Sequence, residues 1–212
     1  MRSPPADPPA TPRPTGSPTR TPAGAPPDAA RLHEAALRHL ARFAATEAGL
    51  LRVLERRIER WARAAEAEGQ PADTVTTAAG AARQAARQVV SRLAQAGAVD
   101  DRAFAAGRAR SLTRAGRSRR AIGAHLAAKG VDPALAVAAL PEDTERELAA
   151  ALIHARRRRI GPFRRSPPDA EGRLKELAAM ARAGFESSVA RAALGLDPAE
   201  AEAIIIHARQ AL

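Results

Sequence analysis

The sequence predicts an all-α protein in which tandem three-helix repeats form an elongated, curved body behind a disordered, proline-rich N-terminal tail. Three observations predict this class. Alanine, the best helix former, is abundant, while aromatic residues make up only 2% of the 212 residues. No run of β-branched or aromatic residues alternates with polar ones, as a half-buried strand requires. Three internal segments also align without gaps, which is typical of repeat proteins.

The first 28 residues have the composition of a tail. They hold ten of the 17 prolines, and their three arginines and two aspartates give a net charge of only +1. Such a segment buries too little apolar surface to offset the entropy lost on ordering. We therefore predict that residues 1–28 are disordered and that the remaining +10 of charge belongs to the folded body.

Three helices are predicted for residues 29–82 and the segment that follows. Asp28 can cap the first helix, and Thr46 can cap the second, because both side chains accept hydrogen bonds from free amides. Gly97 ends a longer third helix. The apolar stripes expected to face the core are Leu32, Ala36, Leu40 and Phe43, then Leu50, Leu54, Ile58 and Trp61, then Val90, Leu93 and Ala96.

The next three helices begin at Asp100, Ser118 and Asp132. Asp100 caps a helix that holds Phe104, Ala105 and Leu112, and Ser118 opens one that holds Ile122 and Leu126 and closes at Gly130. Asp132 precedes Pro133, which suits the first position of a short helix. Further helices are predicted over 144–159, 169–183, 187–194 and 198–211.

An internal repeat organises these helices. The segments 42–54, 114–126 and 182–194 align, with Gly116 and Gly184 at one shared position and an Asp-Pro pair after Gly130 and after Gly195. A three-helix unit buries little surface alone, so stacked units share their cores. The predicted division is a tail (1–28), a first unit with an insertion (29–82), a second unit (83–141) and a third unit (142–212).

Several function classes lack support in the composition. The chain has no cysteine, which fits a reducing compartment, and no apolar run long enough to span a membrane. The five histidines show no metal-ligand spacing, and no phosphate loop or nucleophile motif is present. Asp100 and Asp101 at a helix start are better explained as a cap with a favourable dipole contact than as catalytic carboxylates. We expect a monomeric cytoplasmic protein that is no enzyme and uses no metal or other cofactor.

The net charge of +11 instead predicts an anionic partner. Only two of the 34 basic side chains are lysines, and arginine forks bind phosphate and carboxylate oxygens bidentately. Simple solvation of the charges is the alternative. The aromatic residues occupy mostly core-like positions, so base stacking is expected to be weak. The candidate contact residues are Arg114, Arg117, Arg119, Arg120, Arg156, Arg157, Arg158, Arg159, Arg164 and Arg165.

The segment from Leu93 to Ala105 resembles the most recognisable motif of the RecX family, in which a helix ends at glycine, two aspartates follow, and Phe-Ala begins the next core. The resemblance extends over about residues 31–210, through Lys129-Gly130-Val131 and the stretch from Arg159 to Arg164. The longer segment 66–82 and the proline-rich tail depart from the family. The motif residues are Gly97, Asp100, Asp101, Phe104, Gly116, Gly130, Asp132 and Gly184.

The resemblance implies a row of three-helix repeats that binds in the groove of the RecA filament. It further implies inhibition of ATP hydrolysis and strand exchange by RecA, in DNA repair and the SOS response, with some affinity for single-stranded DNA and also for double-stranded DNA. The alternative that the residues leave open is a general basic nucleic-acid-binding protein that acts without RecA.

Overall fold

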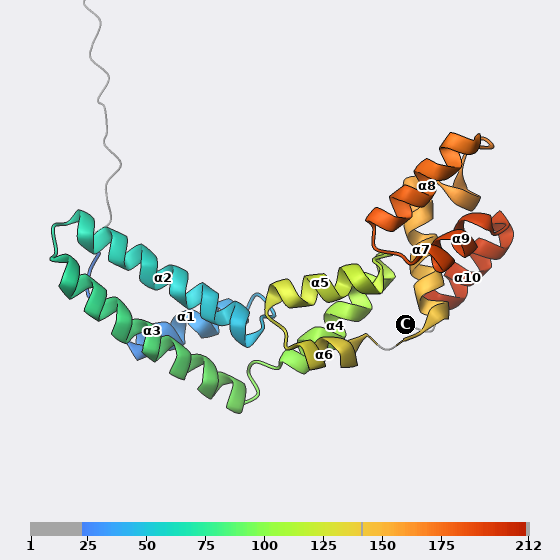
Figure 1. Cartoon of the computed structure of the whole chain (residues 1–212). Helices are drawn as coiled ribbons and strands as arrows, with labels where there is room; N and C mark the ends of the chain where they lie inside the picture. Colours follow the sequence, from blue (N-terminus) through green and yellow to red (C-terminus); the bar gives the residue numbers. More distant parts are fainter. Residues whose placement is uncertain (1–22, 141, 211–212) are drawn as a thin grey trace, which may run out of the picture.

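The computed structural model describes residues 23–140 and 142–210, and within them every regular element is helical. The helices follow one another as a curved row, which confirms the all-α class and the elongated shape (Figure 1). In chain order they are α1 (Ala29–Leu40), α2 (Glu47–Ala67), α3 (Ala72–Gln95), α4 (Asp101–Arg114), α5 (Arg119–Lys129), α6 (Pro133–Ala139), α7 (Thr144–Arg158), the 3-10 turn η1 (Gly161–Phe163), α8 (Ala170–Arg182), α9 (Ser187–Gly195) and α10 (Pro198–Gln210).

The first unit consists of α1, α2 and α3, and its core reaches Val99. Val89, Val90 and Leu93 of α3 pack with Leu54 and other residues of α2 in this core. The predicted boundary between residues 82 and 83 is therefore wrong, because it falls inside α3. The longer segment 66–82 forms the end of α2, a short turn and the first part of α3.

Residues 23–28 are ordered, contrary to the prediction for the whole of 1–28. Asp28 caps α1 by accepting a hydrogen bond from the Arg31 amide, as predicted. Upstream of it, Pro27 is buried and the indole Nε1–H of Trp61 donates to the Gly24 carbonyl at 3.1 Å. This short segment therefore packs onto α2 because it satisfies the one polar atom of a buried tryptophan. The remainder of the predicted tail, residues 1–22, lies outside the described residues.

The second unit comprises α4, α5 and α6 around a small core that includes Ala105, Ile122 and Leu126. Phe104 packs against this core, as the motif predicts, but it is only half-buried and does not lie at the centre. The reason is the shape of the unit: close packing is provided by alanines on α4, and α6 contributes no fully buried residue.

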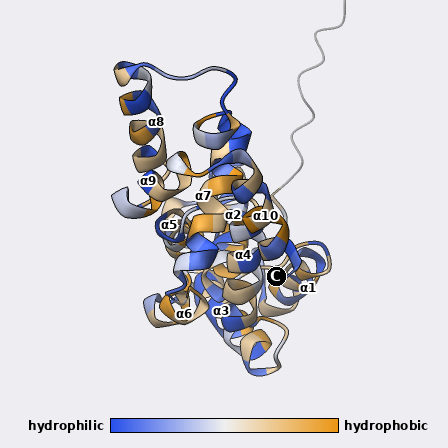
Figure 2. Cartoon of the chain, turned by 90° about the vertical axis from the view of Figure 1, so that its right-hand side faces the viewer, coloured by the Kyte–Doolittle hydropathy of each residue, from blue (hydrophilic) through white to orange (hydrophobic). Residues whose placement is uncertain are grey.

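The third unit contains α7 in addition to the three helices that repeat the earlier plan. Consecutive residues Ala150 to Ile153 of α7 are buried, together with Met180, Phe185 and Ile205. Viewed from the end of the row, a hydrophilic connection leads to α8, which lies at the outer edge of this unit and packs against α9 (Figure 2). The α7 helix thus fills the centre of this unit.

The same hydrogen-bonding arrangement joins the units at both boundaries. Thr46 caps α2, and its buried hydroxyl donates to the Lys129 carbonyl of the second unit at 2.6 Å. Ser118, at the equivalent repeat position, caps α5 and donates to the Ala183 carbonyl of the third unit, also at 2.6 Å. The third copy has Glu186 at this position, without a side-chain cap. The hydroxyl therefore occurs only where another unit follows.

A carboxylate from the following unit completes each boundary. Asp101 accepts a hydrogen bond from the Glu47 amide, the first in α2, at 2.9 Å. Glu147 accepts from the Arg119 amide, the first in α5, at 3.0 and 3.1 Å. Negative charge is favourable at a helix N-terminus, where amides lack partners. Asp100 caps its own helix, so the two adjacent aspartates serve different helices.

The repeat glycines lie at these same boundaries, in the left-handed region of the backbone. A Cβ on Gly130 would meet Ala48 of the first unit at 2.5 Å, and one on Gly184 would meet the Ser118 hydroxyl at 2.7 Å. Gly116 approaches Ile153 of α7 in the same way. The glycines that define the repeat thus allow both a turn and the close approach of neighbouring units.

Candidate anion-binding surface

Four of the ten predicted contact arginines bond to other groups of the protein. Arg119 donates from Nε to the Leu140 carbonyl at 2.9 Å and pairs with Glu142 at 3.1 Å. It thereby fastens the start of α5 to the connection between α6 and α7. Since its fork is already occupied and half-buried, Arg119 is a structural residue.

Arg156, Arg157 and Arg164 are also engaged. Arg156 pairs with Glu202 of α10 at 2.9 Å, and Arg164 forms two hydrogen bonds with Glu176 of α8, at 3.2 and 2.7 Å. Arg157 donates to the Ala115 carbonyl at 2.8 Å, which links α7 to the end of α4. The run of four arginines therefore divides around the helix into structural and exposed positions.

The other predicted arginines are exposed. Among residues 23–140 and 142–210, no carboxylate forms an ion pair with five of them. Arg159 ends α7 in the left-handed conformation. Arg114 is exposed at the end of α4. Those five predicted contact arginines, which are exposed and make no ion pair within those two ranges, are Arg117, Arg120, Arg158, Arg159 and Arg165.

Two histidines show where positive charge gathers. Burial lowers the pKa of His154 most, and Arg158, Arg157 and Arg117 lower it further. Its buried Nε2 has no hydrogen-bond partner among the described residues, and its ring lies 5.6 Å from that of Phe185. The three charged groups that lower this pKa are all arginines, so positive charge gathers beside His154 at the boundary between the second and third units.

Nearby cations also lower the pKa of His125 on α5, further along the row of units. Burial again lowers its pKa most, followed by Arg108, Lys129 and Arg117. The Arg108 Nε–H donates to His125 Nε2 at 3.2 Å, which requires an unprotonated ring nitrogen there. Arg117 is thus near both histidines and connects the two groups of cations.

We call the set formed by Arg52, Arg108, Arg117, Lys129, Arg157 and Arg158 the basic surface. It crosses all three units, because Arg52 of α2 donates to the Lys129 carbonyl at 2.9 Å. Figure 1 shows α2 and α5 along the inner side of the curve. Sequence reasoning missed Arg108 and Lys129 as candidates, because they are far apart in the chain and come near the same histidine only after folding.

Other chemistry finds no support in the part of the chain that the structure describes. No group of three histidine or acidic side chains there is placed to hold a metal ion. None of the described helices combines the length and apolarity that a membrane span needs. The basic surface is the feature that a partner of opposite charge would recognise.

Comparison with known proteins gives a consistent family. Residues 100–140 match the model described as RecX, second three-helix domain. The regulatory protein RecX of Myxococcus xanthus is 39% identical over 172 residues, which cover 79% of this chain and 86% of the relative. That of Agrobacterium fabrum is 40% identical over 111 residues, covering 52% and 59%.

A solved structure agrees at the level of the fold. The crystal structure of a regulatory protein RecX superposes with a TM-score of 0.55 at 19% identity, over 78% of this chain and 70% of that one. The matched second unit coincides with α4, α5 and α6, and the identity to the Myxococcus protein extends far beyond that unit. This chain therefore belongs to the RecX family of regulatory proteins.

Proposed function

We propose that this protein binds RecA filaments on single-stranded DNA and inhibits their ATP hydrolysis and strand exchange. It would act as a cytoplasmic, non-enzymatic, monomeric regulator in DNA repair and the SOS response. Family membership supports the regulatory role. The observation that carries the physical argument is the basic surface that crosses all three units.

The shape and charge of the chain suit such a partner. A filament groove is extended and presents acidic side chains beside DNA phosphates, and a row of units offers an extended surface in return. Arg117 and Arg158 are exposed and have guanidinium forks for those oxygens. Because these arginines come from different units, binding would depend on how the units are placed relative to each other.

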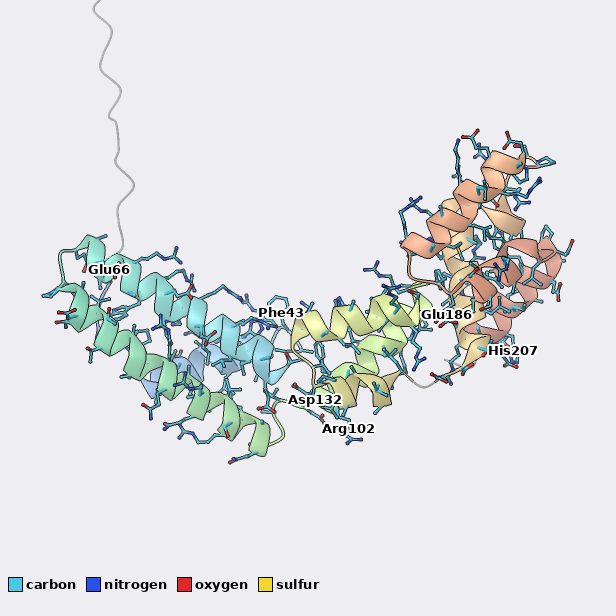
Figure 3. All side chains as sticks on the ribbon, in the orientation of Figure 1. Phe43, Glu66, Arg102, Asp132, Glu186 and His207 are labelled. Carbon is cyan, nitrogen blue, oxygen red and sulfur yellow. The ribbon has the colours of Figure 1, made fainter. Side chains whose placement is uncertain are left out.

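The direct test is RecA ATPase on single-stranded DNA, with this protein at concentrations too low to coat the DNA. We expect strong inhibition by the natural chain and weaker inhibition by the variant R117Q/R158Q. The control R87Q/R102Q removes the same charge from positions outside the basic surface, and Figure 3 shows Arg102 on the outer side of the curve. Equal inhibition by both variants would place the contact elsewhere.

A general nucleic-acid-binding protein is the second candidate, favoured by the net charge of +11 alone. Such a protein would slow RecA only by covering DNA. Inhibition that appears solely at DNA-saturating concentrations, and equally for an unrelated DNA-dependent ATPase, would support this candidate over the first.

A further inference from the structure

A groove between α1 and α2 is lined by cations and by an exposed aromatic ring. Phe43 is 60% exposed, although the sequence predicts it in the apolar stripe of the first helix. The helix ends at Leu40, and a turn in which the Arg42 and Phe43 amides bond to the His39 carbonyl carries the ring outward. Figure 3 shows Phe43 at the end of the first unit that adjoins the second.

The repeat shows that packing does not require a phenylalanine at this position. The equivalent residues of the second and third units are Ala115 and Ala183, whose carbonyls accept hydrogen bonds from Arg157 and Ser118. Only the first unit has an aromatic ring there, and the only ring contact that it makes among the described residues is with His39, at 5.3 Å. Phe43 therefore adds an exposed apolar ring to this groove that the other two units lack.

The charged side chains that line the groove are all basic. The groove has no acidic residue in its lining, which consists of Ala35, Arg38, His39, Ala41, Arg42, Phe43, Val53, Leu54, Arg57 and Arg60. Arg42 and Arg57 make no ion pair within the described ranges. The Arg38–Glu34 pair is long, at 3.6 Å, and solvent-exposed, so it is weak. A phosphate group could therefore replace the glutamate as the partner of Arg38.

We infer that this groove binds single-stranded nucleic acid, with a base stacked on Phe43 and the adjacent phosphates held by Arg42 and Arg57. A ring beside arginine forks matches the alternation of bases and phosphates in a single strand. Bases inside a duplex are already stacked on each other and do not offer a free face. The inference rests on the nucleic-acid part of the proposed function and adds the place and the form in which the strand binds.

The test measures binding of the full chain, without RecA, to a fluorescent 20-nucleotide thymidine strand by anisotropy. F43L should weaken binding about tenfold, the effect of removing one base stack. F43W should bind as well as the natural chain, because tryptophan also stacks. R42Q/R57Q should weaken binding and reduce the salt dependence, by about 0.7 in log–log slope for each phosphate that is no longer neutralised.

Two further ligands separate base stacking from charge alone. An abasic strand of equal length has the same phosphates, so the natural chain should prefer thymidine over it and F43L should not. A polyglutamate peptide tests an acidic protein partner. If polyglutamate competes as well as thymidine does and F43L binds thymidine normally, the groove is not a nucleic-acid site.

The matched control is again R87Q/R102Q, which should bind thymidine more tightly than R42Q/R57Q does, with unchanged helical circular dichroism for all variants. Normal thymidine binding by F43L overturns the inference even where the natural chain inhibits RecA. Conversely, Phe43-dependent binding without inhibition of RecA overturns the proposed function and leaves the groove as a nucleic-acid site.

Discussion

At the scale of single residues, the boundary glycines combine two constraints that substitution can separate. Gly130 and Gly97 both have positive φ, at 80° and 72°, but only Gly130 faces a neighbouring unit. G97A should cost about 1 kcal/mol of unfolding free energy from backbone strain alone. G130A should cost roughly a further 1–3 kcal/mol, because its Cβ would overlap Ala48. Equal losses in urea unfolding would show that the boundary relaxes freely.

Phe104 gives a second prediction at this scale. It is half-buried, so truncation removes only part of the transfer free energy of a buried aromatic side chain. F104A should lower the unfolding free energy by about 1–2 kcal/mol, well below the cost of a fully buried phenylalanine. F185A, at a buried position of the third unit, should cost more and serves as the comparison. A larger loss for F104A would show that the second core is tighter than its exposure indicates.

Phe43 and Phe104 also show which features of the structure the sequence alone does not predict. Helical periodicity places Phe43 and Phe104 on apolar faces, but it does not show that α1 ends before Phe43. It does not show either that alanines fill the space beside Phe104. The predicted caps Asp28, Thr46, Asp100 and Ser118 are confirmed, because capping depends on local hydrogen bonds.

At the scale of the elements, the segment before α1 should contribute to stability. Removing residues 1–28 would delete the cap of α1, the buried Pro27 and the acceptor for the Trp61 indole. We expect a loss of about 2–4 kcal/mol, from the cap and the unpaired indole together. Removing only residues 1–22 keeps all three features and is the matched control. Equal thermal midpoints for the two truncations would contradict this role.

The boundary between the second and third units should weaken in acid. Because the folded pKa of His154 lies below its ordinary value of about 6.5, the unfolded chain binds a proton more readily. The stability that neutral His154 gives to the fold is therefore complete above its ordinary pKa of about 6.5. This stability is lost as the pH falls from about 6.5 towards the folded pKa. H154L should lose less stability than the natural chain when urea unfolding is compared at about pH 7.5 and about pH 5.5. Parallel losses would assign the pH dependence to other groups.

At the scale of the whole molecule, folding decides which arginines are available. The sequence identifies the clusters by density, yet Arg119, Arg156 and Arg164 pair with glutamates that lie 23, 46 and 12 residues away in the chain. The basic surface instead gathers Arg108, Lys129 and other scattered residues from three units. Tertiary pairing of this kind has no local signal, whereas the helices and the repeat do, which explains why the fold is more predictable than the site.

The two boundaries also determine whether the three units act as one surface. S118A removes both the cap of α5 and the buried hydroxyl that donates to the partly buried Ala183 carbonyl. Each loss lowers the unfolding free energy by about 1–2 kcal/mol. Both losses weaken the contact between the second and third units. In repeat proteins, stability is a sum of unit and boundary contributions, so weaker coupling separates the transitions of neighbouring units. We therefore expect S118A to broaden or split thermal unfolding and to weaken RecA inhibition. Binding of single-stranded DNA in the first-unit groove should remain, because Phe43 lies on the far side of the intact Thr46 boundary. A single sharp transition with unchanged inhibition would show that the units are held together without this hydroxyl.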